Sequence, residues 1–151
     1  GLPAVCDGSA GDEQRGQALY GAFMCGLALA TATMGIHHKL CHVIGGTFRL
    51  PHAETHTIIL PHATHYNREA APEAMAAISR ALNADSAAGG IFDLAGKIGA
   101  PTALKDLGLD EKALDHAADI ATASPYYNPR PVTRDGVREL LDDAYHGRRP
   151  D

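Results

Sequence analysis

The stretch that decides the fold is Gly35–His62, which reads GIHHKLCHVIGGTFRLPHAETHTIILPH. It holds six of the nine histidines of the chain, so these residues are concentrated in one place. His38 and His42 are four residues apart, and a helix therefore places both imidazoles on one face, about one turn from each other. We expect a helix over residues 36–44 that presents this pair.

A second helix is expected a short distance further on. The glycine pair Gly45–Gly46 is predicted to end the first helix, because glycine readily adopts the left-handed conformation at a helix C-terminus. Pro51 then begins the next helix, with His52 in its first turn and His56 one turn later. Residues 55–62 are rich in strand formers and on composition alone could form a strand. The flanking Pro51 and Glu54, together with the family resemblance given below, favour a helix. Two helix ends can therefore bring imidazoles to a common point.

Convergent histidines suggest a metal site or an acid–base site, because imidazole is a frequent metal ligand and exchanges protons near neutral pH. We interpret His38, His42 and His52 as such a site. The chain contains no HExxH motif, so a zinc protease has no support. Four further histidines lie apart from the pattern, and we interpret them as hydrogen-bonded or surface residues: His62, His65, His116 and His146.

Several segments carry a family resemblance. GIHHKLCHVIGGTFRLPHAETHTIILPHATHYN resembles the signature segment of the iron-containing (group III) alcohol dehydrogenase superfamily, and the double histidine with KLCH and LPHAETH resembles its maleylacetate reductase branch. The similarity continues through FDLAGKIGAPTALKDLGL, ADIATASPYYNPRP and RDGVRELLDDAYHG. It covers the chain from about Gln17 onward. Several separate motifs in the right order make chance agreement improbable.

The resemblance implies a two-part enzyme, of which this chain matches one part. Members have an N-terminal α/β domain that binds the dinucleotide and a C-terminal all-helical domain, with the active site between them. The 151 residues contain no strand followed by a glycine-rich turn and a helix, which a dinucleotide needs. We therefore expect residues 1–151 to form a single all-helical metal-site and substrate domain. The family also draws an Asp or Asn and a His from a segment that would precede Gly1.

The activity that the resemblance implies is NAD(P)H-dependent reduction of maleylacetate to 3-oxoadipate in the breakdown of aromatic compounds. By this resemblance His38 and His52 are ligands of an iron or zinc ion, His38 serves the catalytic site, and His42 is the proton donor or its relay. Lys39 and Arg49 flank the histidines and are predicted to attract a carboxylate substrate, a solvated surface role being equally open. The other open functions are half of a metal-dependent alcohol dehydrogenase and a non-catalytic helical scaffold.

Composition supports an all-α helical bundle without nucleic-acid partners. The chain is 45% apolar but only 5% aromatic, which suits closely packed helices. Its formal charge of -5, without basic runs, makes nucleic acid an improbable partner. The implied partners are a nucleotide-binding half, a second copy in a homodimer or higher assembly, and a small dicarboxylate.

The N-terminal third is uncharged over residues 16–38, which raises a membrane span as one possibility. Small residues and the lack of an aromatic belt favour a buried central helix instead, beginning near Gly11 and serving as the spine of the bundle. We expect no membrane partner. Three cysteines without CxxC spacing favour free thiols and a cytoplasmic location: Cys6, Cys25 and Cys41.

Beyond residue 67 the sequence predicts short helices with clear start and stop signals. Helices are expected over 72–82, over 86–98 with an interruption at Gly89–Gly90, over 101–107, after a cap at Asp110, and after a cap at Thr133. The proline-rich segment 124–131 is predicted to cross the fold without helix, and its Tyr126, Asn128 and Arg130 are interpreted as structural. The last residues, 146–151, are expected to be frayed.

Overall fold

The computed structural model describes all 151 residues and contains helices but no strands. The all-α class predicted from the sequence is therefore confirmed. In chain order the elements are α1 (Leu2–Cys6), α2 (Asp12–Thr31), α3 (Ile36–Phe48), α4 (His52–Tyr66), α5 (Pro72–Leu82), α6 (Ala87–Lys97), the 3-10 helix η1 (Leu104–Leu107), α7 (Ala113–Thr122) and α8 (Arg134–His146).

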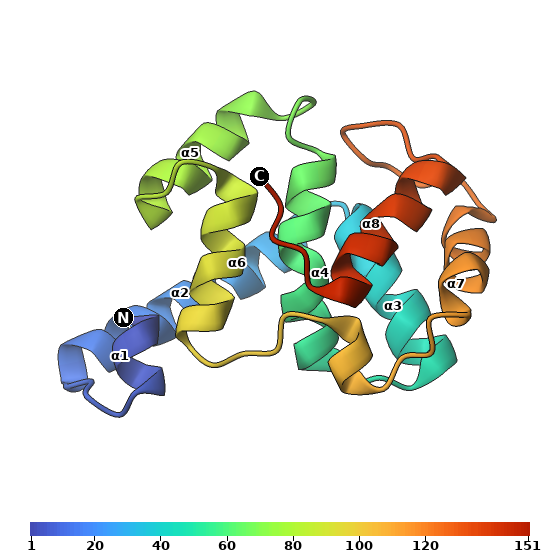
Figure 1. The fold of residues 1–151 in the computed structure, drawn as a ribbon. Helices are drawn as coiled ribbons and strands as arrows, with labels where there is room; N and C mark the ends of the chain where they lie inside the picture. Colours follow the sequence, from blue (N-terminus) through green and yellow to red (C-terminus); the bar gives the residue numbers. More distant parts are fainter.

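Helix α4 is the centre of the fold. It packs against α3, α6 and α8, while α7 closes the other side of the bundle by packing on α3 and α8 (Figure 1). Helix α5 covers α6, and α1 packs on α2. The two helices that carry the histidine motif are therefore neighbours in the middle of the molecule, so their side chains meet without any long loop.

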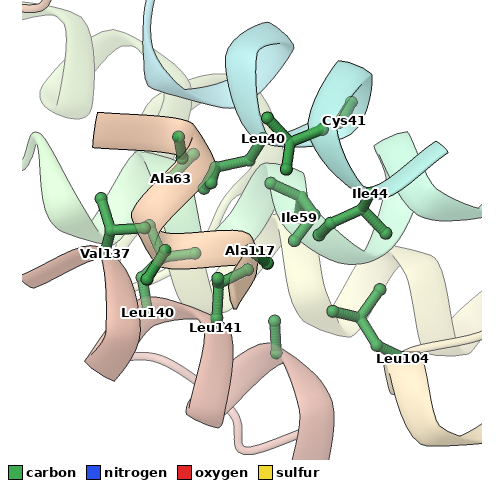
Figure 2. Packing of buried hydrophobic residues seen from close by; sticks show 14 of the residues in the cluster. Leu40, Cys41, Ile44, Ile59, Ala63, Leu104, Ala117, Val137, Leu140 and Leu141 are labelled. Carbon is green, nitrogen blue, oxygen red and sulfur yellow. The ribbon is translucent and has the colours of Figure 1, made fainter. Parts of the chain in front are cut away.

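One hydrophobic core joins α3, α4, α7 and α8. Figure 2 shows Leu40 and Ile44 of α3 facing Ile59 of α4, with Ala117 of α7 and Leu141 of α8 on the other side. All five side chains are fully buried. Burying one such leucine or isoleucine contributes roughly 1.5–3 kcal/mol. This packing holds α3 and α4 in a fixed relation, which the histidine positions depend on.

Several predicted helix ends are confirmed. Thr133 caps α8 by accepting a hydrogen bond from the Gly136 N–H, and Ser86 caps α6 by accepting from the Gly89 N–H. Helix α5 has the predicted bounds. The segment after α7 is not helical, as its prolines require. Signals that act within a few residues along the chain are therefore readable from the sequence.

Both predicted glycine interruptions are wrong. Helix α3 continues through Gly45–Gly46 to Phe48, and the C-cap residue Arg49 takes the left-handed conformation with φ 59°. Helix α6 is likewise continuous through Gly89–Gly90. A Cβ at Gly90 would lie 2.6 Å from the Cβ of Ala84, so close packing requires glycine there without breaking the helix.

The prediction that the first long helix is a buried spine is also wrong. Helix α2 begins after Gly11 as expected, but it has no buried residue, and its Leu19 and Phe23 are 73% and 64% exposed. The residues that precede α2 contain the short helix α1. The uncharged sequence predicts an apolar helix correctly, but α3 to α8 do not supply the surface that would cover it. No single helix is long and apolar enough to span a membrane; α2 and α3 satisfy the criteria only together, with a bend of 95° between them.

The chain end is ordered, contrary to the expected fraying. The Arg149 guanidinium forms two hydrogen bonds of 2.9 Å with the carboxylate of Asp93 on α6. Pro150 is buried, and the His65 Nδ1 donates to the backbone oxygen of Asp151 over 2.9 Å. These contacts are made to residues more than 50 positions away, so the local sequence of the tail does not reveal them.

Candidate functional site

A cluster of five histidines forms where α3 meets α4. Its centre is His56 of α4, whose ring centroid lies 4.9 Å from that of His37, 5.0 Å from that of His38 and 4.3 Å from that of His52. The fifth member, His42, follows one turn after His38, with 6.1 Å between the two ring centroids. The structure therefore brings together all three histidines singled out by the sequence, and adds His37 and His56.

His37 and His56 are not among the site residues predicted from the sequence, although the structure places both in the cluster. The signal for His56 is its place four residues after His52, which puts the two rings on one face of α4. His37 lies beside His38 and its Nε2 is 3.1 Å from the carbonyl oxygen of His56. Only the crossing of α3 and α4 decides that these rings meet, because the two helices are joined by a turn and can be packed in several ways.

Three members of the cluster, His37, His38 and His56, favour the neutral imidazole. Burial lowers the pKa of His56 to about 4, with a further contribution from the charge of His37. Burial also lowers the pKa of His37 and of His38, and the charges of His42 and His52 act on His38 in the same direction. The Nε2 of His56 is buried and has no hydrogen-bond partner. At neutral pH these rings therefore hold free lone pairs in a confined space.

The donors fit a divalent ion that prefers nitrogen ligands. His38 and His52 both lie against His56, and neutral imidazole is a ligand that iron and zinc accept readily. Two imidazoles on one tetrahedral ion need ring nitrogens within about 3–4 Å of each other. That His38 and His52 reach this separation around one cavity stays a prediction.

His42 and His52 are exposed, whereas His37, His38 and His56 are half-buried. The position of His42 one turn after His38 places its ring at the edge of the cluster, where it contacts solvent. A histidine that faces both solvent and the cluster can take up a proton from water and pass it inward.

The two predicted substrate residues lie in different surroundings. The Lys39 ammonium sits 5.7 Å from the ring centroid of Tyr126 in the crossing segment, a cation–π contact. Arg49 is exposed at the end of α3 and forms no ion pair or side-chain hydrogen bond. Lys39 is therefore partly held by an aromatic face, whereas Arg49 is free to meet an anion. Their role toward a substrate stays a prediction.

The crossing segment fixes the start of α3. The Oδ1 of Asn128 accepts a hydrogen bond from the Ile36 N–H over 3.2 Å, and its Nδ2 donates to the Oδ1 of Asn67 over 2.7 Å. A Cβ at Gly35 would lie 2.9 Å from the Asn128 Oδ1, so glycine permits this close approach. The Arg130 guanidinium lies over the Tyr66 ring. These contacts are structural, as interpreted from the sequence, and they anchor the helix that carries His38.

The remaining histidines lie outside the cluster. His65 and His146 donate to backbone oxygens, and His116 packs edge-on against the Phe48 ring. His62 is buried beside Phe92 and its Nε2 has no partner. Only His62 departs from the expected hydrogen-bonded or surface role.

Comparisons with known proteins identify the family of the chain. Residues 1–145 match the model of the Fe-containing alcohol dehydrogenase family, C-terminal. The chain is 54% identical over 136 residues to a maleylacetate reductase from Burkholderia cepacia, and the match covers 90% of this chain and 39% of that protein.

Solved structures show the same relation. A structure from Ralstonia eutropha JMP134, described as an alcohol dehydrogenase, superimposes with a TM-score of 0.94 and 57% identity, covering 99% of this chain and 43% of that one. Maleylacetate reductase from Agrobacterium tumefaciens gives a TM-score of 0.93 and 44% identity, covering 98% of this chain and 42% of that one.

The chain thus spans about two fifths of the length of the relatives it matches. Both the all-helical architecture and the family match extend over nearly all of its residues. The chain belongs to the Fe-containing alcohol dehydrogenase family, where it corresponds to the C-terminal helical domain.

Proposed function

We propose that this chain is the helical part of an NAD(P)H-dependent maleylacetate reductase, which converts maleylacetate to 3-oxoadipate in the breakdown of aromatic compounds. The observation that carries the proposal is the histidine cluster at the crossing of α3 and α4, in a chain 54% identical to a protein with that name. Exposed free thiols at Cys6 and Cys25 suit a reducing compartment such as the cytoplasm.

Reduction of a conjugated double bond needs a hydride, a proton and a positive charge near the developing enolate oxygen. The nicotinamide would supply the hydride, and an iron or zinc ion held by His38 and His52 would supply positive charge. His42, exposed at the edge of the cluster, delivers the proton to the carbon beside the carbonyl group. Arg49 and Lys39 attract the two carboxylates of the substrate by their charge.

The proposed partners are a nucleotide-binding part and a second copy of the enzyme. Hydride transfer requires the nicotinamide to be held about 3–3.5 Å from the reacting carbon. These 151 residues contain no glycine-rich strand–turn–helix that would hold it, so another domain or chain provides this function. The exposed apolar side chains of α2 are the surface available for such association.

The proposal is tested with a chimera in which this chain replaces the matching part of the Burkholderia cepacia maleylacetate reductase. We expect the chimera to oxidise NADH when maleylacetate is added, and the 151-residue chain alone to be inactive. The parent enzyme serves as the control for the assay.

The outcomes discriminate between the candidate functions. Full activity of the isolated chain would contradict the need for a nucleotide-binding part. A folded chimera that reduces short aldehydes but not maleylacetate would assign the chain to an alcohol dehydrogenase, which the Ralstonia structure also allows. A folded chimera that reduces neither would favour the scaffold function.

A further inference from the structure

A second set of metal donors lies on the inner side of the histidine cluster. His37, Cys41 and His56 each place one ligand atom so that all three atoms lie within 4.8 Å of one another. His37 and Cys41 are four residues apart and so share a face of α3, while His56 reaches them from α4. Figure 2 shows Cys41 on α3 at the edge of the core. None of the three was assigned a role in the proposed reductase.

Hydrogen bonding orients His37 for ligation. Its Nε2 lies 3.1 Å from the carbonyl oxygen of His56, and because a carbonyl only accepts, this nitrogen carries the proton. The Nδ1 of His37 therefore keeps its lone pair. Metal-bound histidines commonly donate their other N–H to a backbone carbonyl in this way, which fixes both tautomer and ring orientation.

The other two donors are buried without a hydrogen-bond partner. The Nε2 of His56 is buried without a hydrogen bond, although buried polar atoms are nearly always paired. Cys41 is fully buried, and its thiol makes no hydrogen bond. One oriented imidazole, one unpaired imidazole and one unpaired thiol thus surround a common point.

We propose that His37, Cys41 and His56 bind a divalent cation that favours nitrogen and sulfur ligands, such as zinc. Two imidazoles and a thiolate are ligands that zinc accepts, whereas magnesium and calcium require oxygen. On binding, a metal–sulfur bond replaces the S–H bond of Cys41 and the proton passes to solvent. The donor atoms already lie within 4.8 Å of one another, and side-chain rotation brings them to the roughly 3–4 Å of a tetrahedral complex.

This site is separate from the His38 and His52 pair but adjacent to it. The ring centroids of His56 and His38 are 5.0 Å apart, so two bound cations would repel each other strongly. Occupation of one site therefore weakens the other. Removing His38 and His52 should leave binding by the Cys41 site intact or make it stronger.

The test uses cobalt(II) as the probe, because a cysteine ligand gives cobalt a thiolate charge-transfer band in the near ultraviolet that imidazole ligands do not give. The full 151-residue chain is titrated under reducing conditions, and zinc is then added to displace the cobalt. We expect the band in the wild type and in the Cys6→Ser/Cys25→Ser variant, and its loss on addition of zinc. The His38→Ala/His52→Ala variant should keep the band.

Variants of the three donors make the assignment specific. Cys41→Val, close in volume to the native residue, should abolish the band, and His37→Gln and His56→Gln should each weaken cobalt binding about tenfold or more, with far-ultraviolet circular dichroism checking the fold. The proposal is overturned by absence of the band in the wild type, by its loss in Cys6→Ser/Cys25→Ser or in His38→Ala/His52→Ala, or by unchanged affinity in both glutamine variants. If Cys41→Val does not fold, the two glutamine variants decide.

Discussion

His62 couples stability to pH through its burial beside Phe92. Burial lowers its pKa to about 4, although the charge of Asp143 acts in the opposite direction. The unfolded state therefore binds a proton at His62 below about pH 6.5, whereas the folded state does so only near pH 4. Its contribution is fully present above pH 6.5 and is lost as the pH falls, up to about 3 kcal/mol near pH 4.

The measurement is urea unfolding of wild type and His62→Gln between pH 7 and pH 4. Glutamine removes the titration, so the variant should lose less stability than the wild type over this range, even though other buried histidines contribute to both curves. Parallel curves for the two proteins would show that His62 is protonated equally in the folded and unfolded states.

His42 is expected to matter for turnover and not for folding, because its side chain is exposed at the edge of the cluster. In the chimera with the Burkholderia nucleotide-binding part, His42→Ala should reduce kcat by about 10²–10⁴-fold, the usual contribution of a general acid. His116→Ala, an exposed histidine outside the cluster, is the matched control and should leave kcat unchanged. Normal turnover of His42→Ala would remove this residue from the mechanism.

At the scale of the element, the N-terminus of α8 depends on a single side chain. The Thr133 Oγ1 accepts a hydrogen bond of 3.2 Å from the Gly136 N–H, one of the donors that a helix start leaves free. Thr133→Ala should reduce the free energy of unfolding by about 1 kcal/mol. The exposed Thr47 of α3, whose hydroxyl makes no hydrogen bond, provides the control Thr47→Ala.

Chemical denaturation of both threonine variants gives the comparison. Because α8 contributes Val137, Leu140 and Leu141 to the core, loosening its first turn should lower the stability of the whole domain and not only fray one helix. Equal stabilities of Thr133→Ala and Thr47→Ala would contradict this prediction, because they would mean that water accepts the hydrogen bond of the Gly136 N–H as well as Thr133 does.

At the scale of the whole molecule, α2 leaves large apolar side chains uncovered. Leu19 and Phe23 are among the most exposed of them. Large exposed apolar surfaces are uncommon on soluble monomers, so we expect the chain to self-associate through this helix. Sedimentation velocity of the wild type should show species heavier than the 15.8 kDa monomer.

Charged substitutions test whether the chain associates through the apolar surface of α2. Leu19→Lys/Phe23→Lys should shift the chain toward the monomer without changing its circular dichroism. Gln17→Lys/Ala22→Lys adds the same charge at exposed positions of the same helix that lack large apolar side chains. A monomeric wild type, or equal dissociation by both double variants, would contradict association through Leu19 and Phe23.

Local chemistry in the sequence was sufficient for much of the fold and for part of the site. Proline at the start of α5, Thr133 at the cap of α8 and the recurrence of apolar residues every three to four positions are signals that act within a few residues. They therefore define the elements and the all-α class. The i, i+4 spacing of His38 and His42 likewise predicts a shared helix face. In the tertiary structure the His38 and His42 rings are neighbours, and His52 lies against His56, which joins it to the same cluster.

Only the tertiary structure decided what each face of a helix meets. The sequence of α2 predicts an apolar helix, but it does not show whether that helix is buried or exposed. The sequence around Gly90 suggests a helix break, whereas the structure shows that glycine is needed there because the helix packs closely against Ala84. The meeting of His37 and His56 depends on the crossing of α3 and α4, which the distant core residues of α7 and α8 hold in place. Backbone preferences depend on neighbouring residues and can therefore be predicted from the sequence. Burial depends on contacts between residues that lie far apart along the chain, so only the tertiary structure shows it.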